Sequence, residues 1–222
     1  MLQEIRNLIR KELLIEWKQK YAFNGLLLYV LCMVVVISLA FKGNLNPLTW
    51  NIVYWIIILF VAINAVAKSF MGERQGQLLY QYTLANPAAI IIAKLVYNMV
   101  LLCLVALISL YSYGFLSGIK IADWPLMLSI VLLGCATLSA NLTLVTAIAA
   151  KAENRATLLA VLSFPLLVPV LLILIRLSRY AVEGKEGGLL IENSYDQLFM
   201  IGGMSVVLWV LSVILFPFVW RD

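Results

Sequence analysis

Long apolar runs alternate with short clusters of charged and turn-forming residues along the whole chain. Each run approaches the ~20 residues that a helix needs to cross a bilayer. The runs are continuously apolar rather than alternating, which favours helices over the strands of a barrel. The pattern predicts an all-α integral membrane protein with six spans, at residues 22–41, 51–67, 95–117, 126–150, 157–177 and 197–219. Little remains for a soluble domain, so we expect residues 1–222 to form a single membrane domain.

The composition agrees with this class of protein. Of 222 residues, 64% are hydrophobic and only 12% are charged, whereas soluble domains carry about 25% charged residues. The three cysteines, Cys32, Cys103 and Cys135, fall inside predicted spans and form no C-x-x-C pair. We interpret them as small packing residues.

Residues 1–20 have the pattern of an amphipathic helix. Ile5, Ile9, Leu13 and Trp17 recur at helical spacing, and the basic residues lie on other faces. An apolar stripe among basic residues is typical of a helix in the headgroup region of a membrane. The alternative is a polar leader before the first span.

The Lys and Arg residues predict an orientation. With the N-terminus in the cytoplasm, eleven of the sixteen Lys and Arg residues fall on the cytoplasmic side and five on the other. This distribution obeys the positive-inside rule. We therefore expect both termini, and the segment 68–94 between the second and third spans, to be cytoplasmic.

Small and hydroxyl side chains gather in the fourth predicted span. Ser139 and Thr143 stand one turn apart, with Asn141 between them. Such faces let helices approach closely and form hydrogen bonds across the contact. We interpret them as a helix-packing face, with a substrate pathway or a dimer seam as the alternative. In the fifth span, Pro165 and Pro169 predict a static bend, or alternatively a hinge.

Several kinds of chemistry have no residues to perform them. The sequence contains no histidine and no P-loop motif, and we place no carboxylate in the middle of a predicted span. We therefore expect no catalytic residues, no metal site and no tightly bound cofactor. If the protein is an active exporter, ATP would have to act through a partner subunit, and membrane lipid rather than nucleic acid would surround the protein.

The segment 68–94 is polar for its position between two apolar runs. It contains Glu73, Arg74 and Gly76, and ends with Pro87 seven residues before Lys94. Helix-forming spacing at a membrane surface is typical of a docking element for another protein. The alternative is an ordinary connector resting on the bilayer.

This loop resembles a known family. It reads F-x-x-E-R-x-G-x-L over residues 70–78, then Asn86 and Pro87, then A-K before the third span. The pattern is similar to that of ABC-2-type exporter permeases and, more narrowly, of the CcmB family of cytochrome c maturation. The opening K-E-L-L-I-E-W, the L-Y-V at residues 28–30 and the S-F-P-L-L-V-P-V of the fifth span also resemble that family.

The resemblance implies a function and a set of partners. The first cytoplasmic loop would contain a coupling helix that docks on a separate ATPase subunit. Its residues would be Glu73, Arg74, Gly76, Gln77, Leu78, Leu79, Tyr80, Tyr82 and Pro87. The partners would be a CcmA-like ATPase, CcmC-, CcmD- and CcmE-like haem-handling proteins, and a second copy of the chain in a homodimer.

The implied activity is ATP-driven handling of haem, as a transient substrate, at the bacterial inner membrane. The alternatives are an ABC-2 permease that exports a lipid, polysaccharide or drug, and a non-transporting assembly scaffold.

Overall fold

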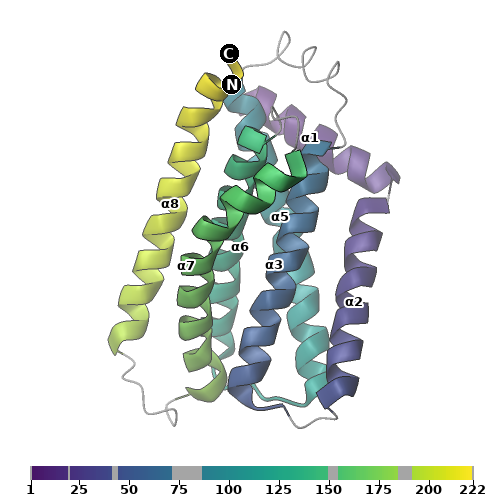
Figure 1. The fold of residues 1–222 in the computed structure, drawn as a ribbon, viewed down its shortest axis with the longest axis vertical. Coiled ribbons are helices and arrows are strands. Elements are labelled where there is room, and N and C mark those ends of the chain that lie inside the picture. Colours follow the sequence, from purple (N-terminus) through teal and green to yellow (C-terminus); the bar gives the residue numbers. More distant parts are fainter. Residues whose placement is uncertain are drawn as a thin grey trace.

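The fold is a bundle of long helices. The computed structural model describes residues 2–19, 21–41, 45–71, 87–149, 155–184 and 192–221, and these ranges contain helices but no strand. The helices are α1 (Leu2–Gln19), α2 (Tyr21–Phe41), α3 (Pro47–Met71), α5 (Pro87–Ser117), α6 (Trp124–Ala149), α7 (Arg155–Glu183) and α8 (Glu192–Arg221). All except α1 are long and apolar enough to cross a membrane. Figure 1 shows these six running lengthwise, with α1 lying across one end.

Each of the six apolar runs predicted from the sequence corresponds to one of these helices, and α5 and α7 extend furthest beyond one end of their runs. Helix α5 begins at Pro87 rather than at residue 95, so Lys94 lies inside the helix and is only 1% exposed. Helix α7 continues to Glu183 rather than ending at residue 177. A helix does not end where the hydrocarbon ends, because its backbone hydrogen bonds are internal. Hydropathy therefore locates the spans but not the helix ends.

Helix α6 is the centre of the bundle. Its spanning segment is 72% buried, whereas that of α2 is 17% buried, and α6 packs against α3, α5, α7 and α8. Its sequence explains this position, because Gly, Ala, Ser and Thr side chains let neighbouring helices approach closely. The central position agrees with the packing interpretation of this span.

Helix α6 approaches two of its neighbours closely at Gly134. A Cβ atom at this position would lie 2.7 Å from the Trp55 ring on α3 and 2.9 Å from Leu174 on α7. Both distances are shorter than a van der Waals contact, so only glycine leaves room for the two neighbours. Three helices therefore meet at one residue.

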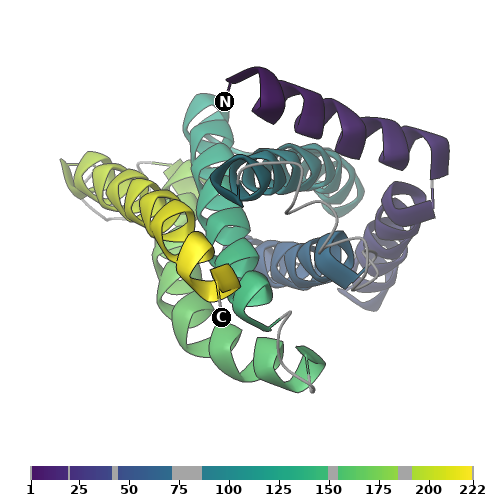
Figure 2. The ribbon, with the colours of Figure 1, turned by 90° about the horizontal axis from the view of Figure 1, so that it is seen from above.

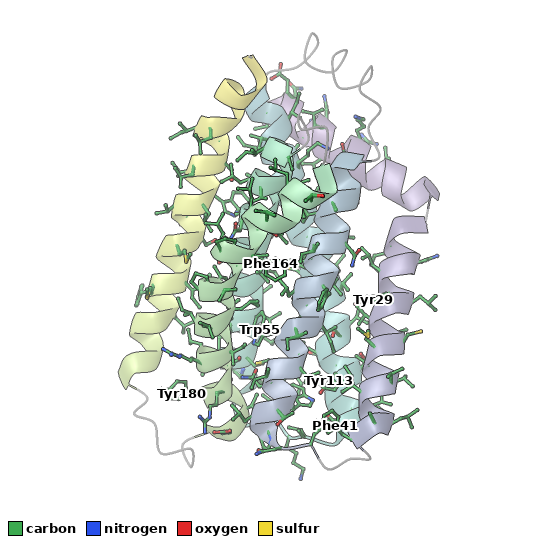
Figure 3. The ribbon with its side chains drawn as sticks, in the orientation of Figure 1. Tyr29, Phe41, Trp55, Tyr113, Phe164 and Tyr180 are labelled. Atoms are coloured by element: carbon green, nitrogen blue, oxygen red, sulfur yellow. The ribbon has the colours of Figure 1, made fainter. Side chains whose placement is uncertain are left out.

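An aromatic cluster fills the space between α3 and α5. The ring of Trp50 stacks on Tyr113, with centroids 5.1 Å apart, and on Tyr54, with centroids 5.9 Å apart. Tyr54 also donates a hydrogen bond to the carbonyl oxygen of Ala106, at 3.2 Å. All three rings are fully buried. Figure 3 shows Tyr113 near the end of the bundle that is opposite α1.

Helix α7 contains both prolines of the fifth predicted span. Pro165 and Pro169 are exposed, while Leu167 and Val170 face the bundle. Figure 1 shows the first part of α7 inclined relative to the rest. Proline causes such bends because it removes a backbone donor and clashes with the preceding turn. The inclination agrees with the predicted bend, and whether it also acts as a hinge stays a prediction.

The two ends of the bundle differ. The N- and C-termini lie at one end, together with α1, the end of α3 and the start of α5 (Figure 1). At the other end a short turn joins α5 to α6. Gly118 ends α5 with a φ of 68° and donates its N–H to the Gly114 carbonyl, at 3.1 Å. Asp123 begins α6 by accepting a hydrogen bond from the Leu126 N–H, at 3.0 Å.

The contact at Gly134 generates a first prediction. Gly134→Ala should destabilise the bundle by about 1–3 kcal/mol, because overpacking displaces Trp55 or Leu174. The measurement is the thermal unfolding midpoint of the purified protein in detergent.

The matched control for this prediction is Gly202→Ala in α8. It adds the same methyl group at a helical glycine that has nothing within 4 Å of a Cβ. Its unfolding midpoint should be unchanged or slightly higher. Equal midpoints for the two variants would contradict the close packing at Gly134.

Candidate functional site

Of the predicted docking loop, the structure describes only the helices that flank it. Glu73, Arg74, Gly76, Gln77, Leu78, Leu79, Tyr80 and Tyr82 lie outside the described residues. Helix α3 ends at Met71 and α5 begins at Pro87, both at the end of the bundle that carries α1 (Figure 1). Proline is well suited to the first helical position, since its missing N–H would have no intrahelical partner there. The assignment of the loop as a docking element stays a prediction.

The predicted N-terminal helix is α1, and part of its apolar stripe packs on the bundle. Ile5 and Ile9 are half-buried, Leu13 is 47% exposed, and the Trp17 side chain lies outside the described part. Helix α1 packs against α5 and α2 (Figure 2). The exposed Leu13 and Leu14 leave apolar surface on α1 that is suited to a headgroup layer.

A polar seam joins α5 and α6. The Asn98 amide donates a hydrogen bond to Thr143 Oγ1, at 3.0 Å, and Ser139 Oγ donates to the Leu95 carbonyl, at 3.2 Å. All of these side chains are buried. Hydrogen bonds of this kind between spanning helices typically contribute about 0.6 kcal/mol each. The packing interpretation therefore fits Ser139 and Thr143.

Asn141 does not belong to that seam. Two residues from Ser139 correspond to about 200° of rotation around a helix, so Asn141 lies on a different face. It shares this face with Gly134, two turns away, which contacts α3 and α7. Asn141 is fully buried, and neither its Nδ2 nor its Oδ1 has a hydrogen-bond partner among the described residues. An unpaired buried amide costs about 1–3 kcal/mol.

Two further polar atoms in this region have the same deficit. Asn98 Oδ1 and Thr146 Oγ1 are buried and find no partner within the described part of the chain. Buried polar atoms without partners are rare in stable structures. Helix α6 thus carries both satisfied and unsatisfied polar groups in the interior, and only the satisfied groups stabilise this arrangement of helices.

A second network, which the sequence did not reveal, joins α3 to α7. Trp55 Nε1 donates to Ser178 Oγ at 2.7 Å, and the Asn51 amide donates to the Ile175 carbonyl at 2.8 Å. Ser178 Oγ is also within 2.7 Å of Asn51 Oδ1 and 2.6 Å of the Leu174 carbonyl. The indole of Trp55 is therefore held by a hydrogen bond while its ring covers Gly134.

The fifth predicted span ends at residue 177, just before Ser178, and this boundary is wrong. The residue lies inside α7 and is fully buried. The guanidinium of the following Arg179 pairs with Glu183 one turn later, at 2.7 Å. Spacing could have found part of the network, because Asn51 and Trp55 are one turn apart. It could not have identified α7 as their neighbour.

The cysteines and carboxylates form no metal-binding group in the part of the chain that the structure describes. Cys32, Cys103 and Cys135 are free thiols. No group of three potential metal ligands occurs in the ranges that the structure describes.

The chain matches a protein-family model. The model described as CcmB protein matches residues 3–220 of the 222-residue chain. No curated protein matches the chain. The family match covers nearly every residue, including all the helices that could span a membrane.

The two kinds of polar group on α6 generate a second prediction. Asn141→Leu should raise the thermal unfolding midpoint, since it removes an unpaired buried amide worth about 1–3 kcal/mol. Thr143→Val should lower the midpoint, because it leaves the Asn98 amide without an acceptor. The measurement is thermal unfolding in detergent. A lower midpoint for Asn141→Leu would mean that the amide is hydrogen-bonded in the folded protein.

Proposed function

The chain belongs to the CcmB family, and on this premise we propose that it is the permease subunit of an ATP-driven haem-handling complex. The family makes it an ABC-2-type, multi-pass inner-membrane component of the haem-export system for cytochrome c maturation. It acts within a Ccm complex that includes an ATPase. The mode of coupling, the specific partners and the role of haem belong to the proposal.

The proposed coupling site is the loop between α3 and α5. Its support is that α3 and α5 are both long spanning helices and that the loop joins them directly. A short helix in this loop, with Leu78, Leu79 and Tyr80, would dock on a CcmA-like ATPase. Closure of the ATPase would then move α3 and α5 as rigid bodies.

The proposed orientation puts the loop and both termini in the cytoplasm. The excess of Lys and Arg supports it, and so does the position of both termini and the ends of the loop at one end of the bundle (Figure 1). The opposite end, with the α5–α6 turn, would face outward. CcmC-, CcmD- and CcmE-like proteins would receive haem there.

Haem would be a transient substrate rather than a bound cofactor. The chain contains no histidine to act as an axial ligand. A second copy of the chain would complete the permease, as the six spans of one chain correspond to one half of such a complex. Large apolar residues exposed on the outer faces of α7 and α8, including Phe164 and Val207, offer surface to lipid or to that second copy.

Deletion of the gene tests the function as a whole. We expect loss of covalent haem in c-type cytochromes, measured by haem staining after denaturing electrophoresis, with recovery when the wild-type gene is returned. Normal staining in the deletion strain would refute the proposal. Normal haem staining in a strain whose ATPase subunit cannot hydrolyse ATP would instead indicate that the chain is an assembly scaffold that does not need ATP.

The coupling site is tested by Leu79→Glu. We expect the ATPase subunit to be lost when the complex is purified through this chain, because a charge would enter an apolar docking contact at a cost of several kcal/mol. The measurement is the ATPase-to-permease ratio after purification.

The matched control for the coupling test is Leu14→Glu. It makes the same change at a half-exposed position of α1, and it should retain the ATPase. If both variants retained the ATPase equally, the loop would not be the docking site.

A further inference from the structure

A groove lies at the end of the bundle opposite both termini. It has a volume of about 460 Å³ and is formed where α5 ends, along the turn, and where α6 begins. Its lining includes Tyr111, Gly114 and Phe115 from α5, Ile119 and Lys120 from the turn, and Trp124 from α6. The volume is within the range of small-molecule sites.

The walls of the groove are aromatic and are already in place. Tyr111 and Trp124 stack nearly parallel, with centroids 5.5 Å apart and an interplanar angle of 17°. Phe115 is 88% exposed. Packing against other helices does not account for an aromatic side chain with this exposure. Together the three rings form an apolar, π-rich surface that is open to a ligand.

The turn that carries Lys120 is held at both ends. Gly118 closes α5 through its bond to Gly114, and the Asp123 N–H donates to the Ala181 carbonyl of α7 at 2.9 Å. The backbone of the turn is therefore fixed, and Lys120 lines the groove together with the aromatic residues. Gly114 contributes open space, since nothing lies within 4 Å of a Cβ atom there.

We propose that this groove binds a porphyrin dicarboxylate, with its ring on the surface formed by Tyr111, Phe115 and Trp124 and a propionate on the Lys120 ammonium. A flat conjugated ring suits near-parallel aromatic side chains, and a carboxylate suits an ammonium group. No histidine is present, so the contacts use the ring and the carboxylate rather than the metal. The inference rests on the proposed handling of haem and assigns a location to it.

A phospholipid is the competing occupant, because aromatic rings and a lysine also occur at headgroup level. The groove favours the porphyrin since its lining is confined to residues between Tyr111 and Trp124 and includes three aromatic rings. An acyl chain would instead follow the length of a spanning helix.

A cysteine-protection experiment tests the site in the assembled complex. Gly114→Cys places a thiol in the groove, and the rate of its reaction with a membrane-impermeant maleimide is measured in phosphatidylcholine vesicles. Haemin and metal-free protoporphyrin IX should both slow the reaction about tenfold at saturation. Adding Lys120→Glu to this variant should raise the porphyrin concentration needed for half-maximal protection about tenfold, because the charge-assisted contact is lost.

Three controls make the result specific. The wild-type chain reports the native thiols, and Phe199→Cys reports a 79% exposed position on α8 outside the groove. Vesicles containing phosphatidylglycerol report lipid binding. Equal protection of Phe199→Cys, equal protection by phosphatidylglycerol alone, or no protection by either porphyrin would overturn the proposal.

An experiment in cells separates this inference from the proposed function. Gly114→Trp, which fills the groove, and Lys120→Glu should each reduce haem staining of c-type cytochromes when returned to the deletion strain. Full staining with both variants, in a strain where deletion abolishes staining, would refute the groove and leave the proposed function intact. Full staining without the gene would refute both.

Discussion

The packing of one glycine against one indole joins three helices of this bundle. Gly134 brings α6 within contact of Trp55 on α3 and Leu174 on α7. The hydrogen bond from Trp55 to Ser178 then fixes the same indole to α7. Because lipid is as apolar as the helices, shape and hydrogen bonding decide which helices associate. The central place of α6 follows from this contact together with the seam to α5.

Some polar groups inside the bundle are hydrogen-bonded and others are unpaired, and this difference is relevant to conformational change. Ser139, Thr143 and Ser178 are paired and hold this arrangement of helices together. Asn141 is buried and unpaired on the face toward α3 and α7. A protein that changes shape benefits from groups that do not stabilise one state only. Asn141 weakens this state, and α7, on the same side of α6, contains two prolines.

The sequence predicted the helices better than their contacts. Hydropathy located all six spans, and small residues at helical spacing indicated that the fourth would be closely packed. The network of Asn51, Trp55 and Ser178 was not predictable, because it depends on α3 and α7 being neighbours. Ser178 itself was misplaced, since the fifth predicted span ended one residue before it. The groove combines residues from α5, a turn and α6, and none of these segments has a distinctive motif of its own. The loop after α3 was assigned as a docking element from its residue pattern, and this assignment stays a prediction.

The length of α5 has a mechanical consequence. Its 31 residues contain no proline after the first position, so the helix is continuous over about 46 Å. This exceeds the ~30 Å of hydrocarbon in a bilayer. One end of this rod is attached to the loop after α3, and the other end carries Tyr111, Gly114 and Phe115. A displacement applied at the loop would therefore be transmitted to the opposite end of the bundle by one continuous helix, without a kink that could absorb it.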